Sequence, residues 1–170
     1  MFRIVLLFLF IISACKNTTD TKGSNEVPDK ITQKDNAMTR VHLTDLHDQP
    51  IELEKFKGKT VFINFWATWC KPCREEMPSV QEAMKILKDE KIEFLFASDE
   101  TTEQIEEFKA AHEYSFNYVK VESLSSLNII GLPTTFIFNS SGELVFSEMG
   151  YRKWDNKANI DLILNNAKPK

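Results

Sequence analysis

The stretch NFWATWCKPCREEMP, residues 64–78, places Cys70 and Cys73 three positions apart among aromatic and charged residues. Such a pair can serve as a structural disulfide, as half of a metal site, or as a redox couple. A disulfide across so short a separation closes a very small loop and therefore adds little stability. A structural zinc site needs four ligands, and the chain's histidines are the widely spaced His42, His47 and His112. The residues thus favour the redox couple.

The surroundings of the pair predict a reactive thiol at Cys70. Residues 60–66 are a mostly apolar run typical of a buried strand, and positions 77, 80, 84 and 87 are apolar at helical spacing. A helix that begins at or just after Cys70 favours the thiolate through its free N–H groups and its dipole. Lys71 adds positive charge nearby. Cys73, one turn further on, can reach the same sulfur and resolve a mixed disulfide.

The composition points to one acidic domain. The chain has 170 residues, of which 42% are hydrophobic and 27% charged, and its formal net charge is −4. This length supports one domain with a substantial hydrophobic core and is too short for two domains that each have such a core. Nucleic acid is not expected as a partner, because phosphate recognition needs clustered Lys and Arg.

The first fifteen residues have the pattern of an export signal. Arg3 precedes an apolar run at residues 4–12, which is shorter than the roughly 20 residues of a transmembrane helix. The sequence ISAC follows and resembles a bacterial lipobox, in which Cys15 is lipidated and becomes the mature N-terminus. Lipidation of Cys15 leaves one pair among the three cysteines, which accounts for their odd number. A plain signal peptide or short anchor with an incidental cysteine is the alternative.

Two further regions follow the signal. Residues 16–37 are polar, nearly free of large apolar side chains, and interrupted by Gly23 and Pro28, which predicts a flexible tether. Residues 38–170 are expected to form the folded domain. At its start, segments 41–46 and 51–53 flank a polar turn and predict a β-hairpin.

The rest of the domain is expected to alternate strands and helices. The expected strands are residues 60–66, 92–97, 134–138 and 143–147, the last two joined by a turn. One helix is expected to begin near Cys70, and two further helices are expected at residues 103–112 and about 156–167. This order indicates an α/β fold with a central mixed sheet flanked by helices.

The motif at residues 64–78 resembles the thioredoxin superfamily, and within it the TlpA/ResA-like thiol-disulfide oxidoreductases with their AhpC/TSA-redoxin-type domain. A second segment, GLPTTF at residues 131–136, resembles the cis-proline motif of that family. The likeness extends from about residue 39 to residue 167, and the two motifs together are far more specific than a lone CxxC. The resemblance implies a thioredoxin-like fold that carries the predicted hairpin as an N-terminal extension.

The resemblance also implies roles for individual residues. Cys70 would attack a partner's disulfide, Cys73 would resolve the mixed disulfide, and Pro133 would face the thiols and hold the partner's backbone. Glu76 matches a glutamate that several relatives carry three residues after the second cysteine, where it can shuttle a proton for Cys73. Asn64 stands where thioredoxin carries a buried aspartate. The residues expected to line the substrate groove are Trp69, Lys71, Pro72, Leu132 and Thr134.

The function implied is thiol-disulfide exchange with exported proteins in an extracytoplasmic space, with the periplasm expected. The family typically acts as a reductant, for example in cytochrome c maturation, and exchanges electrons with a transmembrane donor or acceptor. The redox group is the Cys70–Cys73 disulfide itself, and no metal or further cofactor is expected. A redoxin-type thiol peroxidase and a copper or zinc chaperone on the same fold are the alternatives. The direction of electron flow stays open, because small changes around the thiolate decide it.

Overall fold

Strand β3 (Thr60–Phe65) lies at the centre of the fold, and all six of its residues are buried. The computed structural model of the protein describes residues 37–167. The predictions for the export signal, for Cys15 and for the tether up to residue 36 lie outside these residues. Complete burial of β3 follows from a sheet that is covered on both faces, which agrees with its mostly apolar sequence.

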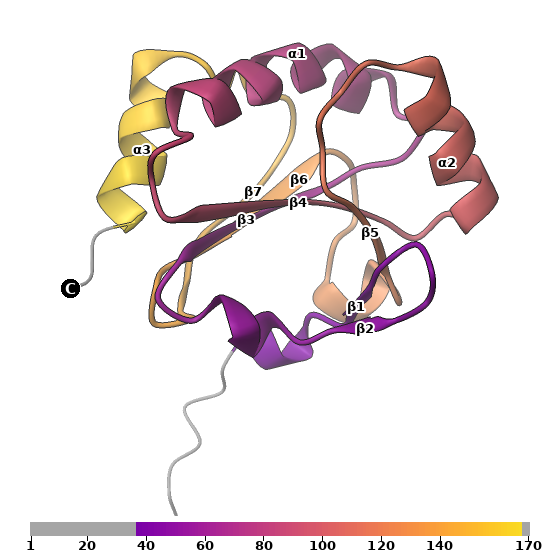
Figure 1. The fold of residues 1–170 in the computed structure, drawn as a ribbon, viewed down its shortest axis with the longest axis horizontal. Helices are drawn as coiled ribbons and strands as arrows, with labels where there is room; N and C mark the ends of the chain where they lie inside the picture. The colour runs from indigo at the N-terminus through magenta and orange to yellow at the C-terminus, as the bar shows by residue number, and fades with distance from the viewer. Residues whose placement is uncertain (1–36, 168–170) are drawn as a thin grey trace, which may run out of the picture. The chain divides into compact units, whose positions relative to one another are not determined.

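Six more strands complete one mixed sheet around β3. They are β1 (Leu43–Thr44), β2 (Pro50–Ile51), β4 (Ile92–Ser98), β5 (Tyr118–Val121), β6 (Thr134–Phe138) and β7 (Leu144–Met149). The strand order is β2-β1-β5-β4-β3-β6-β7 (Figure 1). Strands β3, β4 and β5 are parallel, and all other pairings are antiparallel. The predicted mixed sheet is therefore confirmed.

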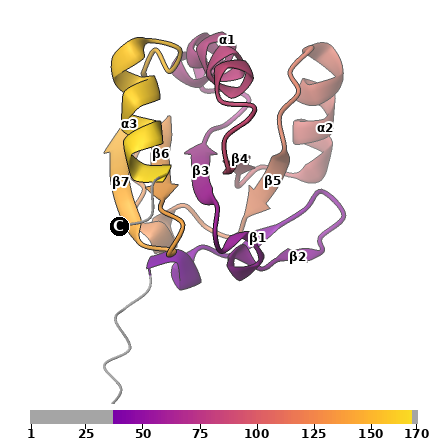
Figure 2. The same cartoon turned by 60° about the vertical axis from the view of Figure 1, so that its left-hand side comes forward.

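Three α-helices cover one face of this sheet, as Figures 1 and 2 show. They are α1 (Lys71–Ile86), α2 (Thr102–Ala111) and α3 (Lys157–Ala167). Side chains from all three helices pack with Phe62 of β3 and Phe96 of β4 in one core cluster. No helix within residues 37–167 is long and apolar enough to cross a membrane.

The opposite face of the sheet is covered by shorter elements. These are the 3-10 helices η1 (Ala37–Arg40), η2 (Leu53–Phe56) and η3 (Ser125–Leu127). Their apolar residues pack with Val61 and Ile63 of β3 in a second core cluster. Because neighbouring residues of a strand point to opposite faces, β3 contributes to both clusters and links them.

The thioredoxin-like α/β fold and the N-terminal β-hairpin extension are as predicted, although the paired part of the hairpin is only two residues long on each side. Strand β5 was not predicted. Its sequence is only YVKV, and its extended form depends on pairing with β4 on one side and β1 on the other. A segment this short has no reliable local signal, since strand preference depends strongly on neighbouring strands.

Candidate active site

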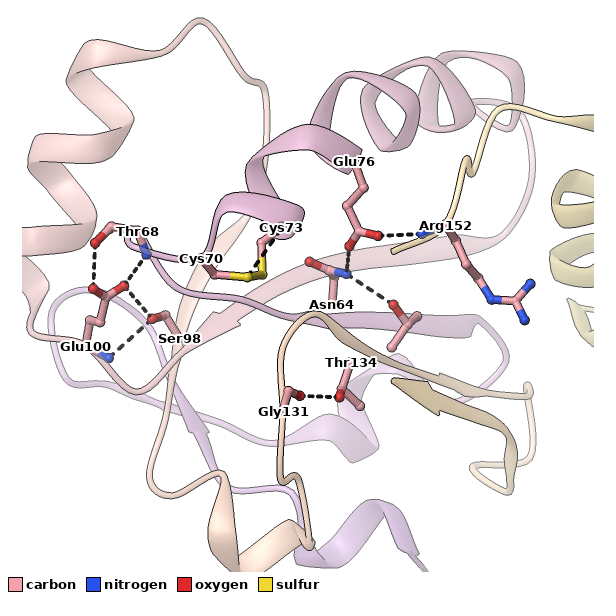
Figure 3. The surroundings of a disulfide bond; sticks show 11 residues. Asn64, Thr68, Cys70, Cys73, Glu76, Ser98, Glu100, Gly131, Thr134 and Arg152 are labelled. Carbon is pink, nitrogen blue, oxygen red and sulfur yellow. Dashed lines mark hydrogen bonds between the residues drawn. A yellow bond between two sulfur atoms is a disulfide. The ribbon is translucent and has the colours of Figure 1, made fainter. Parts of the chain in front are cut away.

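Cys70 and Cys73 are joined by a disulfide at the N-terminus of α1 (Figure 3). Cys70 is the N-cap residue of the helix, and its Sγ accepts a hydrogen bond from the Cys73 N–H at 3.3 Å. Cys73 lies inside the first turn and is 0% exposed, whereas Cys70 retains 3% exposure. When the disulfide is reduced, the free N–H groups and the dipole at this helix end favour a thiolate at Cys70.

The loop that precedes Cys70 is held by Glu100, which follows β4 (Figure 3). The Thr68 N–H donates to Oε2 of Glu100 at 2.6 Å, and the Thr68 hydroxyl donates to Oε1 at 2.6 Å. The Ser98 hydroxyl also donates to Oε2, at 3.1 Å. Glu100 was not singled out from the sequence. The one available signal was its position after a buried strand, because parallel strands end at the same edge of a sheet, where functional residues gather.

Glu76 lies one helical turn after Cys73 and is 1% exposed. Its Oε1 accepts a hydrogen bond from Nδ2 of Asn64 at 2.7 Å, and its Oε2 accepts one from the Arg152 N–H at 3.0 Å. Nδ2 of Asn64 also donates to the Thr135 hydroxyl at 3.1 Å. Figure 3 shows the carboxylate between Asn64 and Arg152. Glu76 thus connects α1 to β3 and to the segment after β7.

Burial raises the pKa of Glu76 to about 7, although the hydrogen bonds from the Arg152 N–H and from Asn64 act to lower it. A carboxyl group with this pKa can take up or release a proton near neutral pH. Cys73 lies on the same side of α1, because helix positions three apart share a face. The role of Glu76 in proton exchange with Cys73 stays a prediction that this placement on one helix face motivates.

The segment before β6 contains a cis peptide bond between Leu132 and Pro133. The Pro133 carbonyl accepts a hydrogen bond from the Gly150 N–H at 2.7 Å. The Thr134 hydroxyl donates to the Gly131 carbonyl at 2.7 Å, which closes a tight turn around the proline. Figure 3 shows this Gly131–Thr134 contact beside the disulfide region.

Four exposed apolar side chains lie on the loop before the disulfide, on the cis-proline segment and at the end of β7. This apolar collar consists of Trp69, Ile130, Met149 and Tyr151, which are between 51% and 91% exposed. Trp69 precedes Cys70, Ile130 belongs to the cis-proline segment, and the other two lie at and after the end of β7. Met149 also packs over Gly131, where a Cβ atom would lie 2.6 Å from its Sδ. Clustered exposed apolar groups mark a contact surface for another molecule.

The residues expected to line the substrate groove differ in how exposed their side chains are. Lys71 and Pro72 are exposed in the first turn of α1, and Nζ of Lys71 lies 3.6 Å from a carboxylate oxygen of Glu75. Leu132 is half-buried and packs against both core clusters. Thr134 is only 5% exposed, so the prediction that it lines the groove is corrected. Its hydroxyl donates to the Gly131 carbonyl, so the Thr134 side chain stabilises the cis-proline segment.

Of the apolar collar, the sequence analysis identified only Trp69. Ile130, Met149 and Tyr151 belong to no motif, and a single apolar residue near a turn carries no signal of exposure. Their role as a group becomes visible once the fold brings the cis-proline segment and the end of β7 together.

Replacing Ile130 with serine should test the apolar collar. Ile130 is 91% exposed, so the change should leave folding intact. If a partner buries this side chain on docking, kcat/KM for reduction of a polypeptide such as insulin should fall roughly tenfold. The rate with oxidised dithiothreitol, which is too small to cover the collar, should stay the same. Ile86→Ser is the matched control, because Ile86 is 52% exposed at the far end of α1; an equal loss in both variants would argue against the collar.

Histidines do not join the site. His112 follows α2, and its Nδ1 lies 2.8 Å from the Phe108 carbonyl oxygen. In the described part of the chain, no three or more His, Cys, Asp or Glu side chains are grouped in a way that could hold a metal ion.

Comparison with known proteins identifies a matching family and similar proteins. The AhpC/TSA family matches residues 34–147. The thiol-disulfide oxidoreductase ResA of Bacillus cereus is 33% identical over 149 residues, which is 85% of this chain and 84% of that protein. ResA of Bacillus subtilis is 34% identical over 107 residues, covering 61% of this chain and 60% of that protein.

Solved structures share the fold. A thiol:disulfide interchange protein of the thioredoxin family from Chlorobium tepidum matches with a TM-score of 0.61 at 24% identity, over 73% of this chain and 93% of that one. StoA from Bacillus subtilis matches with a TM-score of 0.54 at 23% identity, over 65% of this chain and 87% of that one. At these identities the structural likeness concerns the fold alone.

Proposed function

The chain belongs to the AhpC/TSA family and is a thiol-disulfide oxidoreductase, and from this premise we propose that it reduces disulfides of exported proteins in an extracytoplasmic space. Its substrates are proteins that carry thiols or disulfides. The observation that carries the proposal is the Cys70–Cys73 disulfide at the start of α1, bordered by the apolar collar and backed by the buried Glu76.

Reduction of a partner takes two exchanges. The Cys70 thiolate attacks one sulfur of the partner's disulfide, forming a mixed disulfide and releasing the other sulfur as a thiolate that then takes up a proton. Cys73 next gives its proton to Glu76 and attacks the Cys70 sulfur. This second exchange closes the Cys70–Cys73 disulfide and releases the partner's remaining sulfur. Two electrons pass from the cysteine pair to the partner, which ends as a dithiol.

The charges near the sulfurs support the reductive direction. Glu76, when ionised, and Glu100, which holds the loop before Cys70, both place negative charge around the couple. A nearby carboxylate disfavours a thiolate. Oxidants such as DsbA owe their high potential to a stabilised reduced form, so carboxylates that oppose the thiolate favoured by the helix N-terminus shift the couple toward a stronger reductant.

The reduction potential of the Cys70–Cys73 couple tests this direction. We expect a value near or below about −230 mV, in the range of thioredoxin and glutaredoxins. The measurement is equilibration of the purified protein with thiol redox buffers at pH 7, with the dithiol fraction quantified by mass spectrometry after alkylation. A value close to about −120 mV, as in DsbA, would make the protein an oxidant and overturn the proposed direction.

The same proposal includes attachment to a bacterial membrane. A lipid on Cys15 and a tether of residues 16–37 would let the domain reach both exported proteins and a transmembrane electron donor, as a role in cytochrome c maturation would require. Two acyl chains on one cysteine suffice for stable anchoring, whereas one is marginal. Incorporation of a labelled fatty acid should therefore be lost in Cys15→Ala, and labelling that persists in this variant would exclude the anchor.

A further inference from the structure

Met149 is the most exposed methionine within residues 37–167. Its side chain is 59% exposed, whereas Met38 is 4% exposed, Met77 is 0% exposed and Met84 packs against the core. A thioether that oxidants can reach is converted to methionine sulfoxide, which turns an apolar side chain into a polar one. The place of Met149 in the fold decides what such a change would do.

Strand β7 brings Met149 to the edge of the sheet from which the active-site loop leaves. Met149 lies opposite Thr134 at the start of β6, and Thr134 lies opposite Phe65 at the end of β3. From Phe65 the chain continues through the loop that contains Trp69 and reaches Cys70. Three neighbouring strands therefore place Met149 on the same side of the fold as this loop.

The Met149 sulfur lies against the cis-proline segment. A Cβ atom on Gly131 would lie 2.6 Å from Sδ and 3.6 Å from Cγ of Met149, so the thioether fills the space beside Gly131. In the following residue, the Gly150 N–H donates to the Pro133 carbonyl at 2.7 Å, which holds the end of β7 against this segment. One side of the sulfur is therefore closed by Gly131, and an added oxygen has room only on the side that faces away from it.

We propose that Met149 is a modification site, at which a peroxide oxidises the thioether to the sulfoxide and thereby weakens the docking of partner proteins on the apolar collar. With hydrogen peroxide, the sulfur supplies two electrons and the O–O bond breaks. One oxygen forms the S–O bond, and the other leaves as water together with both protons. The inference rests on the proposed function only in taking the collar as the surface that partners contact.

The new oxygen would lie on the surface that a partner covers. A sulfoxide oxygen is a hydrogen-bond acceptor, and an apolar partner surface would bury it without a donor, which is unfavourable. The Cys70–Cys73 couple is not changed by this step. Oxidation of Met149 would thus slow electron transfer to partner proteins without consuming the couple, and reduction of the sulfoxide would restore it.

The first measurement is a map of sulfoxide formation. The purified protein is treated with hydrogen peroxide while Cys70 and Cys73 form their disulfide, and catalase then removes the peroxide. Peptide mass spectrometry should find sulfoxide at Met149 before Met77 or Met84. A map in which a buried methionine is oxidised first, or in which Met149 is not oxidised, overturns the proposal.

The second measurement is the rate of partner reduction. The treated protein is reduced with dithiothreitol, the dithiothreitol is removed, and the rate constant for reduction of insulin is compared with that of untreated protein. It should fall roughly tenfold, the effect of an apolar side chain that a partner no longer buries favourably. The rate with hydroxyethyl disulfide, which is too small to cover the collar, should stay the same. An unchanged rate with insulin, or an equal loss with both substrates, overturns the proposal.

Two variants identify Met149 as the residue responsible. Met149→Leu has no sulfur to oxidise, so its rate with insulin should be the same before and after treatment with peroxide. Met84→Leu is the matched control, because Met84 is a partly buried methionine, and it should stay as sensitive as the wild type. A Met149→Leu protein that loses as much of its own rate as the wild type overturns the proposal.

Reversal tests the contact with Gly131. The two classes of methionine sulfoxide reductase each act on one epimer of the sulfoxide. Because Gly131 closes one side of the Met149 sulfur, one epimer should predominate, and one class of reductase alone should restore most of the rate with insulin. Equal partial recovery with each class alone would contradict the geometry on which the proposal depends.

Failure of the proposed function would be seen separately. The sulfoxide map needs no partner, so its outcome does not depend on catalysis. If the untreated protein does not reduce insulin, the reductive function falls, and the effect of Met149 is then measured in the opposite direction. The disulfide form is mixed with reduced ribonuclease A, and sulfoxide at Met149 should slow the oxidation of that polypeptide. An unchanged rate there overturns the proposal as well.

Discussion

Replacing Cys73 with alanine should convert the protein from a catalyst into a trap. In Cys73→Ala, Cys70 can still attack a partner's disulfide, but no second cysteine within residues 37–167 can release the adduct. At about 1 mM external thiol, turnover should fall at least roughly 100-fold, because a well-oriented internal group has an effective concentration far above that of any added thiol. Non-reducing gels and mass spectrometry of envelope extracts should show partners linked through Cys70.

Cys70→Ala is the matched control for this experiment. Its remaining Cys73 is fully buried inside the first turn of α1, so adducts should be absent and activity should be at background. Abundant adducts in Cys70→Ala, with few in Cys73→Ala, would reverse the assignment of attacking and resolving thiol. No adduct in either variant would argue against the exchange mechanism altogether.

Glu76→Gln should remove a large pH dependence of stability. The pKa of Glu76 is raised to about 7 by burial, from an ordinary value of 4.5. Between these two pH values the folded state holds a proton that the unfolded state has released. The free energy of unfolding must then fall as the pH rises from 4.5 to 7, and it levels off above that. At about 1.4 kcal/mol per pKa unit, the wild type should lose about 3 kcal/mol relative to Glu76→Gln.

Urea unfolding of the oxidised forms at several pH values measures this difference. Glu75→Gln is the appropriate control, because Glu75 is the neighbouring exposed glutamate on the same turn, paired with Lys71. It should keep the pH dependence of the wild type. If Glu76→Gln has the same slope as the wild type between pH 4.5 and 7, the buried carboxyl does not carry the proton assigned to it.

The two carboxylates at the site have different physical roles. Glu100 is only partly buried and is occupied by three donated hydrogen bonds, so it acts as a fixed anchor for the loop before Cys70. Glu76 is fully buried, accepts two hydrogen bonds and has a pKa near neutrality. One carboxylate therefore positions the attacking thiol, while the other is suited to serve the resolving thiol.

Much of the fold could be predicted because its central elements have strong local patterns. The buried strand at β3, the helix that follows Cys70 and the β6–β7 hairpin each follow from runs or spacings within about twenty residues. Strand β5 could not be predicted in this way. Its four residues take their conformation from β4 and β1, which lie far from it in the sequence.

The residues of the active site likewise divide into those predictable from local motifs and those that depend on distant segments. Cys70, Cys73 and Pro133 stand in short motifs, so the chemistry of thiol exchange was determined by the sequence itself. That Glu76 is buried, and not an exposed residue like Glu75, depends on packing against Asn64 and on the segment at Arg152, 76 positions further along the chain.

What the tertiary structure alone decided is the environment of the sulfurs. The anchor at Glu100, the apolar collar and the hydrogen bonds that hold Glu76 come from segments separated by tens of residues, and no local pattern relates them. The sequence determined which atoms can react, because the helix start and the cysteine spacing are local. The fold decided what surrounds those atoms, since burial and hydrogen bonding across segments arise only when the strands are assembled.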